Sequence, residues 1–372
     1  MSLNSKLVVF YLFGFLFVFS GCVEHSKDAL LSTEIKVNAG EALDFLNDLA
    51  DDNPDNSEVF YQLSRVHFEQ GSFERALQNI KKAVDIKGDY AEYHFMEGMI
   101  YQKLNRPDES IKALLLAESM GKTSQELYKI IAEEYLRVGM SDKAREAINR
   151  LTSMKPSAES FTLKGQIMLS LGDTAQAIDN FEKSIELDKS YIRPVVILAD
   201  INIARNNNEK AFYFVNHLME LDPDNLDFME KKGNLLQRSG QLDSAVQVFK
   251  HIASVRDDYM DLYKLSNIYY LMGEYDSSRM MAEQAFIKNE EFLEARLVIA
   301  RSLEKLRKYQ DAIDVYELIV ESDSTFNLAI TELDNLKRKV AYLWRLEQQR
   351  TARDSAIKNM PPPVQKKELD DN

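Results

Sequence analysis

The only cysteine of this 372-residue sequence is Cys22, in the stretch VFSGCVE at residues 18–24. A single cysteine cannot form a disulfide within its own chain. Thiolate chemistry requires neighbouring groups that lower the thiol pKa, and apolar or small residues precede Cys22 instead. Nothing around it resembles a packed core that would bury a free thiol. The segment that leads up to Cys22 must therefore explain its role.

The first 21 residues have the order of a secretory signal. One positive charge, Lys6, precedes the uninterrupted apolar run LVVFYLFGFLF at residues 7–17, and the small residues Ser20 and Gly21 follow. Charged, apolar and small-residue regions in this order are typical of a removable signal peptide. A helix over residues 7–19 would be about 20 Å long, which is short of the ~30 Å hydrocarbon core of a bilayer. A signal-anchor helix that extends past Ser20 remains the alternative.

The sequence Ser-Gly-Cys at residues 20–22 resembles the end of a bacterial lipoprotein signal. The resemblance implies that the signal 1–21 is removed and that Cys22 becomes a lipidated N-terminus. Phe19 departs from the aliphatic residue usual three positions before the cysteine. Several acyl chains anchor a protein stably, because each buried methylene contributes about 0.8 kcal/mol. Val23 after the cysteine favours the outer membrane of a bacterial envelope, without indicating which face.

Other residues give no pattern of a reactive centre. The five histidines, at positions 25, 67, 94, 217 and 251, form no HExxH motif and no cluster with metal-ligand spacing, and no phosphate-binding GxxxxGK occurs. We therefore predict no catalytic residue, no metal site and no small-molecule cofactor. The net charge of −14 also disfavours nucleic acid as a partner.

Glycines reveal an internal repeat. Gly71, Gly139, Gly172, Gly240 and Gly273 recur in one phase. If Gly71 is position 15 of a repeat that starts at residue 57, further repeats start at 91, 125, 158, 192, 226, 259 and 293, at spacings of 33 or 34 residues. A fixed period of this size indicates a solenoid of small helical units.

Two positions of the repeat hold only small residues. Position 8 is Ser64, Gly98, Ala132, Gly165, Ala199, Gly233, Ser266 and Ala300, and position 20 is Ala76, Ser110, Ala144, Ala177, Ala211, Ala245, Ser278 and Ala312. Apolar stripes of helical period lie on both sides of the central glycine. Each repeat is therefore predicted to be an antiparallel helix pair whose backbones approach closely at the two small positions.

This pattern resembles the tetratricopeptide repeat (TPR) family over residues 57–326. Large residues that the family prefers are present as Tyr61, Leu63 and Phe73 in the first repeat, and as Tyr269 and Tyr275 in the seventh. The resemblance implies an all-α fold, a right-handed α-solenoid of about eight TPR helix pairs with capping helices.

The predicted organisation follows from this register. Residues 1–21 are the signal, 22–56 a lipidated N-terminus with a half-repeat capping helix, 327–353 a C-terminal capping helix in which Trp344 is a packing residue, and 354–372 a disordered tail. The eight repeats are 57–90, 91–124, 125–157, 158–191, 192–225, 226–258, 259–292 and 293–326.

In TPR proteins the first helices line a concave groove that holds a protein segment. By this resemblance the candidate groove combines exposed aromatic and basic side chains, although some of them could pack between repeats instead. They are Tyr61, Arg65, Phe95, Met99, Lys103, Lys129, Arg137, Tyr263, Asn267, Tyr270 and Arg301. They do not reproduce the Lys/Asn clamp with which some TPR domains hold a C-terminal carboxylate.

We therefore expect a membrane-anchored, non-catalytic adaptor or scaffold for protein–protein interactions in a bacterial envelope assembly, which could serve secretion, outer-membrane assembly or cell-wall enzymes. The alternative is a surface lipoprotein that captures an external peptide or protein. An enzyme is the least favoured class, because the sequence contains no motif of a reactive centre.

Overall fold

The computed structural model of the protein describes residues 42–358. Cys22, the signal segment 1–21 and residues 359–372 lie outside this part of the chain. Residues 42–52 form a helix, and every further regular element between residues 53 and 358 is helical too, as predicted. None of the helices within 42–358 combines the length and the apolar composition needed to cross a bilayer.

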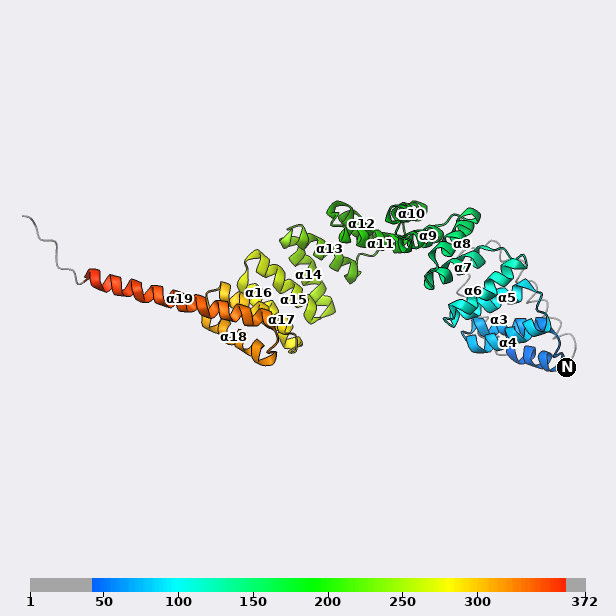
Figure 1. The fold of residues 1–372 in the computed structure, drawn as a ribbon, viewed down its shortest axis with the longest axis horizontal. Coiled ribbons are helices and arrows are strands. Elements are labelled where there is room, and N and C mark those ends of the chain that lie inside the picture. Colours follow the sequence, from blue (N-terminus) through cyan, green and yellow to red (C-terminus); the bar gives the residue numbers. More distant parts are fainter. Residues whose placement is uncertain (1–41, 359–372) are drawn as a thin grey trace, which may run out of the picture. The chain divides into compact units, whose positions relative to one another are not determined.

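The helices follow one another at short intervals (Figure 1). They are α3 (Ser57–Glu69), α4 (Phe73–Ile86), α5 (Ala91–Lys103), α6 (Pro107–Ser119), α7 (Gln125–Arg137), α8 (Ser141–Met154), α9 (Ala158–Ser170), α10 (Thr174–Leu187), α11 (Ile192–Ala204), α12 (Asn208–Leu221), α13 (Leu226–Arg238), α14 (Leu242–Arg256), α15 (Tyr259–Met272), α16 (Tyr275–Lys288), α17 (Leu293–Lys305), α18 (Tyr309–Ser322) and α19 (Asn327–Lys358). The odd-numbered helices from α3 to α17 begin at the eight residues where the period placed the repeat starts.

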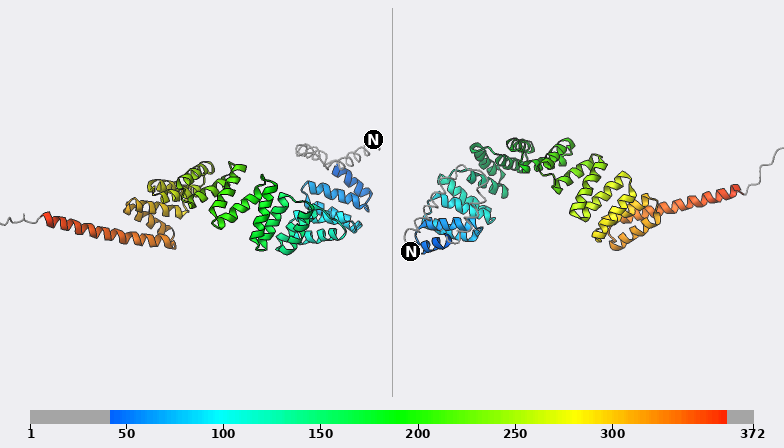
Figure 2. Two further views of the ribbon diagram at one scale, coloured as in Figure 1. Left: turned by 90° about the horizontal axis from the view of Figure 1, so that it is seen from above. Right: turned by 180° about the vertical axis from the view of Figure 1, so that it is seen from behind.

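Two compact units divide the chain, an N-terminal half up to Tyr191 and a C-terminal half from Ile192. Within each half, the first helix of a repeat packs against its own second helix, as α3 does against α4, and the second helix also packs against the next first helix, as α4 does against α5 (Figure 2). Consecutive first helices, such as α5 and α7, touch directly as well. Each half is therefore a stack of TPR-like helix pairs.

The small positions bring the paired helices together. Both positions are buried in all eight repeats. A Cβ atom added to Gly165 would lie 2.5 Å from a ring carbon of Phe181, a side chain with no exposed surface. In the second repeat a serine at the crossing joins the two helices by a hydrogen bond. Ser110 Oγ donates to the Gly98 carbonyl at 2.8 Å. The predicted close crossing is confirmed.

Position 15 has a left-handed backbone in every repeat, not only in the five that carry glycine. Asn105, Asn206 and Arg307 occupy it in the others with φ between 55° and 62°. Asparagine tolerates this region, whereas an ordinary side chain pays about 1–2 kcal/mol there. The turn between the two helices thus requires a positive φ, and Arg307 adopts it under strain.

Replacing Arg307 by glycine is therefore expected to raise the free energy of unfolding by about 0.5–1 kcal/mol, because glycine removes the strain but has more conformational freedom in the unfolded chain. The matched control is Lys112→Gly on the exposed face of α6. Glycine inside this helix should lower the free energy of unfolding by about 1 kcal/mol. Urea unfolding followed by circular dichroism measures both changes. Changes of the same sign would show that the backbone at Arg307 is unstrained.

The helix α19 closes the C-terminal half. It starts in phase with a ninth repeat, and Ala329, Leu333 and Leu336 join the core cluster formed with α17 and α18. Arg301 holds Glu332 through both carboxylate oxygens at 2.6 and 2.9 Å, and the buried Tyr316 hydroxyl donates to the same carboxylate at 2.9 Å. We predicted that this helix ends at residue 353, but it continues to Lys358. Trp344, predicted to pack, is 64 % exposed within the part of the chain that the structure describes.

Candidate protein-binding face

The N-terminal half presents one face that is built from its first helices, α3, α5, α7 and α9. We call it the first-helix face. Seven predicted groove residues belong to its helices, namely Tyr61, Arg65, Phe95, Met99, Lys103, Lys129 and Arg137. Their environments divide them into aromatic residues packed between repeats, charged residues paired between repeats, and exposed positions.

The aromatic end of this face is packed between α3 and α5. The rings of Tyr61 and Tyr93 lie 5.1 Å apart, and the Tyr93 hydroxyl is 3.1 Å from Ser57 Oγ. Burial, with the nearby Glu92 carboxylate, raises the pKa of Tyr61 to about 12. Arg65 stands over the same ring at 5.9 Å. Tyr61 therefore joins two repeats and presents only part of its ring to a partner.

Phe95 was predicted as an exposed groove residue, and the structure corrects this. Its side chain is only 6 % exposed, and the ammonium of Lys122 covers the ring at 4.8 Å. The Phe95 side chain, at position 5 of the second repeat, is buried because α5 contacts neighbouring helices on several sides. Met99 is half-buried and Lys103 is exposed. A change at Phe95 would disturb the fold, so it is unsuitable as a test of binding.

Several charges of the first-helix face are paired across repeats. Lys129 of α7 donates to Glu159 of α9 at 2.5 Å, Gln102 of α5 to Glu133 of α7 at 3.1 Å, and Arg137 of α7 to Asn105 at 2.7 Å. Burial alone would lower the pKa of Lys129, but the bond to Glu159 outweighs it and the pKa is raised. These side chains connect consecutive repeats and are only partly available to a ligand.

Arg137 also faces a buried carboxylate on its own helix. Glu134 has no exposed surface, and its Oε1 lies 3.3 Å from the Arg137 guanidinium. Burial raises the pKa of Glu134, and the arginine opposes the shift. A charge that compensates a buried carboxylate stabilises the native state, so Arg137 contributes to the structure of α7.

The candidate residues of the C-terminal half have comparable local roles. The ring of Tyr263 packs on Phe292 at 4.9 Å, Asn267 donates to the Tyr263 carbonyl at 3.0 Å, and the ring of Tyr270 packs on Tyr275 at 5.4 Å. Arg301 is bound by Glu332, as described above. Tyr263, Asn267, Tyr270 and Arg301 thus remain groove candidates by register, but each has a contact within its own half.

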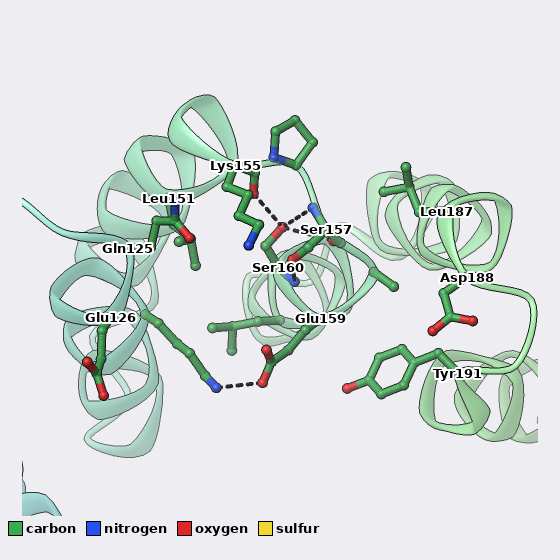
Figure 3. A pocket seen from close by; sticks show the side chains of 14 residues that line it. Gln125, Glu126, Leu151, Lys155, Ser157, Glu159, Ser160, Leu187, Asp188 and Tyr191 are labelled. Carbon is green, nitrogen blue, oxygen red and sulfur yellow. Dashed lines mark hydrogen bonds and ion pairs between the residues drawn. The ribbon is translucent and has the colours of Figure 1, made fainter. Parts of the chain in front are cut away.

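A hollow of about 750 Å³ opens between the third and fourth repeats (Figure 3). It lies where the first turns of α7 and α9 meet the last turns of α8 and α10. Its lining residues are Gln125, Glu126, Lys129, Leu151, Lys155, Pro156, Ser157, Ala158, Glu159, Ser160, Leu163, Leu187, Asp188 and Tyr191. A volume of this size is sufficient for a small molecule or for a few residues of a peptide.

The hollow has an apolar floor and a polar rim. Leu151 and Leu163 are almost completely buried beneath it, whereas Leu187 is 53 % exposed at its edge. The Lys129–Glu159 pair lies on one side, and the Tyr191 hydroxyl points toward Glu159 from the other (Figure 3). Asp188 accepts bonds from the backbone and hydroxyl of Ser190, which lower its pKa and keep it ionised. An apolar side chain with an adjoining polar backbone would match this arrangement.

Of the predicted residues, only Lys129 lines the hollow. The prediction considered first-helix positions alone, whereas Leu151, Lys155, Leu187 and Tyr191 come from the ends of second helices and the loops after them. The available signal was Leu187, an apolar residue beside the turn that ends the fourth repeat. Within residues 42–358, no group of three or more His, Cys, Asp or Glu side chains is arranged to hold a metal ion.

Comparisons with known families identify the repeat. Models described as tetratricopeptide repeat match residues 38–94 and, in a second case, residues 91–120 and 158–191. The chain contains tetratricopeptide repeats. A model described as "Anaphase-promoting complex, cyclosome, subunit 3" matches residues 238–319 in the C-terminal half.

The chain is similar to other proteins at low identity. A TPR repeat-containing protein of Methanocaldococcus jannaschii is 23 % identical over 79 % of this chain and 54 % of its own length. The protein O-mannosyl-transferase TMTC3 of Homo sapiens is 21 % identical over 59 % of this chain, but the match covers only 26 % of the human protein. The chain thus spans between a quarter and about half of these relatives.

A solved structure agrees with the fold. The C-terminal part of a TPR repeat-containing protein from Cytophaga hutchinsonii superposes with a TM-score of 0.58 at 17 % identity, covering 64 % of this chain and 99 % of that one. This likeness concerns the fold. TPR repeats mediate protein–protein interactions and are generally non-catalytic, which indicates protein or peptide partners.

Proposed function

We propose that this TPR protein is a lipid-anchored adaptor of a bacterial envelope assembly that holds a segment of a partner protein in the hollow between its third and fourth repeats. The observation that carries the binding role is this hollow, in which the apolar surfaces of Leu163 and Leu187 adjoin ionised side chains on α7 and α9. At the hollow, residues of the first-helix face adjoin apolar surface contributed by the ends of the second helices α8 and α10.

The chemistry of the hollow favours an extended segment over a small metabolite. At its rim Lys129 is paired with Glu159, and Asp188 is bonded by Ser190. The lining carries charges of both signs, so it offers hydrogen bonds rather than a strong net charge. Backbone amides and carbonyls of a peptide can use such bonds while one aliphatic side chain reaches the leucine floor. Binding energy in such interfaces comes mostly from a few buried anchors.

The anchoring role is supported by the sequence around Cys22, which lies outside the described residues. The order of charge, apolar run and Ser-Gly-Cys is the basis for a lipidated N-terminus. A lipid at one end of the chain would leave the repeats free to meet partners near the membrane. The role in an envelope assembly rests on this anchor and on the protein-binding nature of TPR repeats.

Photo-crosslinking in cells tests the binding role. A photoreactive residue at position 187 or 191 of the full chain should give adducts with the same partner, because both positions border the hollow. Mass spectrometry of the adducts would identify the partner segment and show whether it carries an aliphatic anchor.

Leu115 on α6 provides the matched control, since it is an exposed leucine, 38 % accessible, away from the hollow. The same residue at position 115 should give none of the adducts seen from positions 187 and 191. Equal adducts from all three positions, or adducts from position 115 alone, would refute the hollow as the binding site.

A further inference from the structure

The last helix of the described chain is far longer than its repeat requires. First helices of the repeats have 13 or 14 residues, whereas α19 has 32. We call residues 341–358 the overhang. Every residue from 341 to 355 is exposed, and α19 projects past α17 and α18 in both views of Figure 2. The overhang has no packing partner within the described part of the C-terminal half.

Only the first part of α19 is held in place. Glu332 is bound by Arg301 and Tyr316, and Lys339 donates to Glu304 of α17 at 2.8 Å. Beyond Val340 no further side chain of the described chain supports the helix. Helices derive most of their stability in proteins from packing of one face. Within residues 42–358 the overhang therefore lacks such support.

Apolar side chains mark the face on which such support would act. Tyr342, Leu343 and Leu346 are 60 %, 39 % and 42 % exposed. Leu346 follows Tyr342 by four residues and Leu343 by three, so it neighbours both on the helix surface. Leu343 also follows Leu336 by seven residues, which continues the stripe that packs against the last repeat. The packed face thus runs on into solvent.

The charges around this face have both signs. The basic residues Arg345, Arg350, Arg353 and Lys358 are interspersed with the acidic residues Glu347 and Asp354. In a parallel, in-register pair, each arginine would lie beside the same arginine of the second chain, so that like charges would meet. An antiparallel pair instead brings Glu347 and Asp354 of one overhang alongside arginines of the other. The segment is therefore complementary to itself in the antiparallel sense.

We infer that the overhang of α19 pairs in an antiparallel manner with the overhang of a second copy of this chain. Each copy contributes the same surface, as a two-fold contact requires. A membrane surface fits less well, because an interfacial helix needs apolar and charged residues on opposite sides. Here Trp344, 64 % exposed, lies on the other side of the helix from Tyr342 and Leu346. Arg350 and Arg353 follow Leu346 by four and seven residues, so charges lie on the same side as the apolar residues.

The size of the surface predicts a weak pair. The overhang is about 27 Å long and a helix is about 10 Å wide. It therefore buries less than the ~800 Å² per partner of a standard interface. We expect a reversible dimer whose population depends on concentration, in the micromolar range rather than the nanomolar.

Sedimentation equilibrium of the full chain over micromolar concentrations tests this inference. The unchanged chain should show a reversible monomer–dimer equilibrium. Leu343→Glu together with Leu346→Glu should weaken it at least about tenfold, because carboxylates would replace the apolar contact. Leu271→Glu on α15, where the leucine is 61 % exposed, is the matched control and should leave the equilibrium unchanged.

The remaining outcomes decide against the pair. A chain that is monomeric at all concentrations, or a dimer that persists in the double variant, overturns the inference. A monomer that floats with vesicles of equal parts phosphatidylcholine and phosphatidylglycerol, and loses flotation in the double variant, assigns the overhang to membranes instead. Circular dichroism verifies that the variants keep their helix content, so that loss of the dimer is not loss of folding.

Discussion

Replacing Gly165 by leucine is expected to lower the free energy of unfolding by about 3 kcal/mol, near the upper end of the range for overpacked cores. A Cβ atom at this position would already lie 2.5 to 2.8 Å from three carbons of the Phe181 ring. That ring is completely buried in the packing of α10 against α9 and has no space to withdraw. The higher helix propensity of leucine offsets less than about 1 kcal/mol of the cost.

Urea unfolding followed by circular dichroism measures this change, with two comparison variants. Gly165→Ala should show a smaller loss, since it adds only the Cβ atom. His251→Leu changes an exposed residue of α14 and should stay within about 0.5 kcal/mol of the unchanged chain. If leucine at 165 and at 251 gave the same midpoint, the close crossing of α9 and α10 would not be essential to the fold.

Cys22→Ala is expected to remove the chain from the membrane fraction or to leave it there as an unprocessed precursor. The reason is that the acyl chains on Cys22 would form the anchor, and several chains bind a bilayer much more strongly than one. Within residues 42–358 no helix could replace them by crossing the membrane. The expected change is from a lipidated, processed chain in the membrane fraction to either a released chain or an unprocessed precursor, neither of which carries a lipid.

Detergent partitioning and intact mass spectrometry measure both parts of this prediction. The unchanged chain should enter the detergent phase and carry the mass of its acyl chains on a polypeptide that begins at Cys22. Cys22→Ser serves as a second variant, since its hydroxyl resembles the thiol in size. A mature mass without a lipid increment in the unchanged chain would refute the lipid anchor.

The helical architecture could be predicted because its determinants are local and repeated. Small residues at Gly165 and Ala177, and at the same two positions of every other repeat, are required wherever two backbones cross closely. The register was over-determined by eight copies, so that departures such as Asn105 at the glycine position did not disturb it. The left-handed turn at Arg307 was not predicted, since arginine is not a residue type that indicates a positive φ.

The candidate groove was predicted less well, because register gives the helix a residue belongs to but not what its side chain meets. Phe95 and Tyr61 both occupy position 5. Phe95 is buried beneath Lys122, whereas the ring of Tyr61 packs against the ring of Tyr93 and is only partly buried. Lys129 and Arg137 were predicted to meet a ligand. That stays a prediction; in the structure they bond to residues about thirty positions away, on neighbouring repeats.

The sequence by itself determined the repeat, its boundaries and the sites of close helix contact, since each depends on residue size and backbone geometry within a few turns. Only the tertiary structure decided where apolar surface stays uncovered. Leu187 borders a hollow and Leu343 projects on a free helix, although both belong to helices of ordinary composition. The exposure of an apolar side chain depends on the helices that stack on either side of its own helix and on the lengths of the side chains they present. No single repeat contains that information.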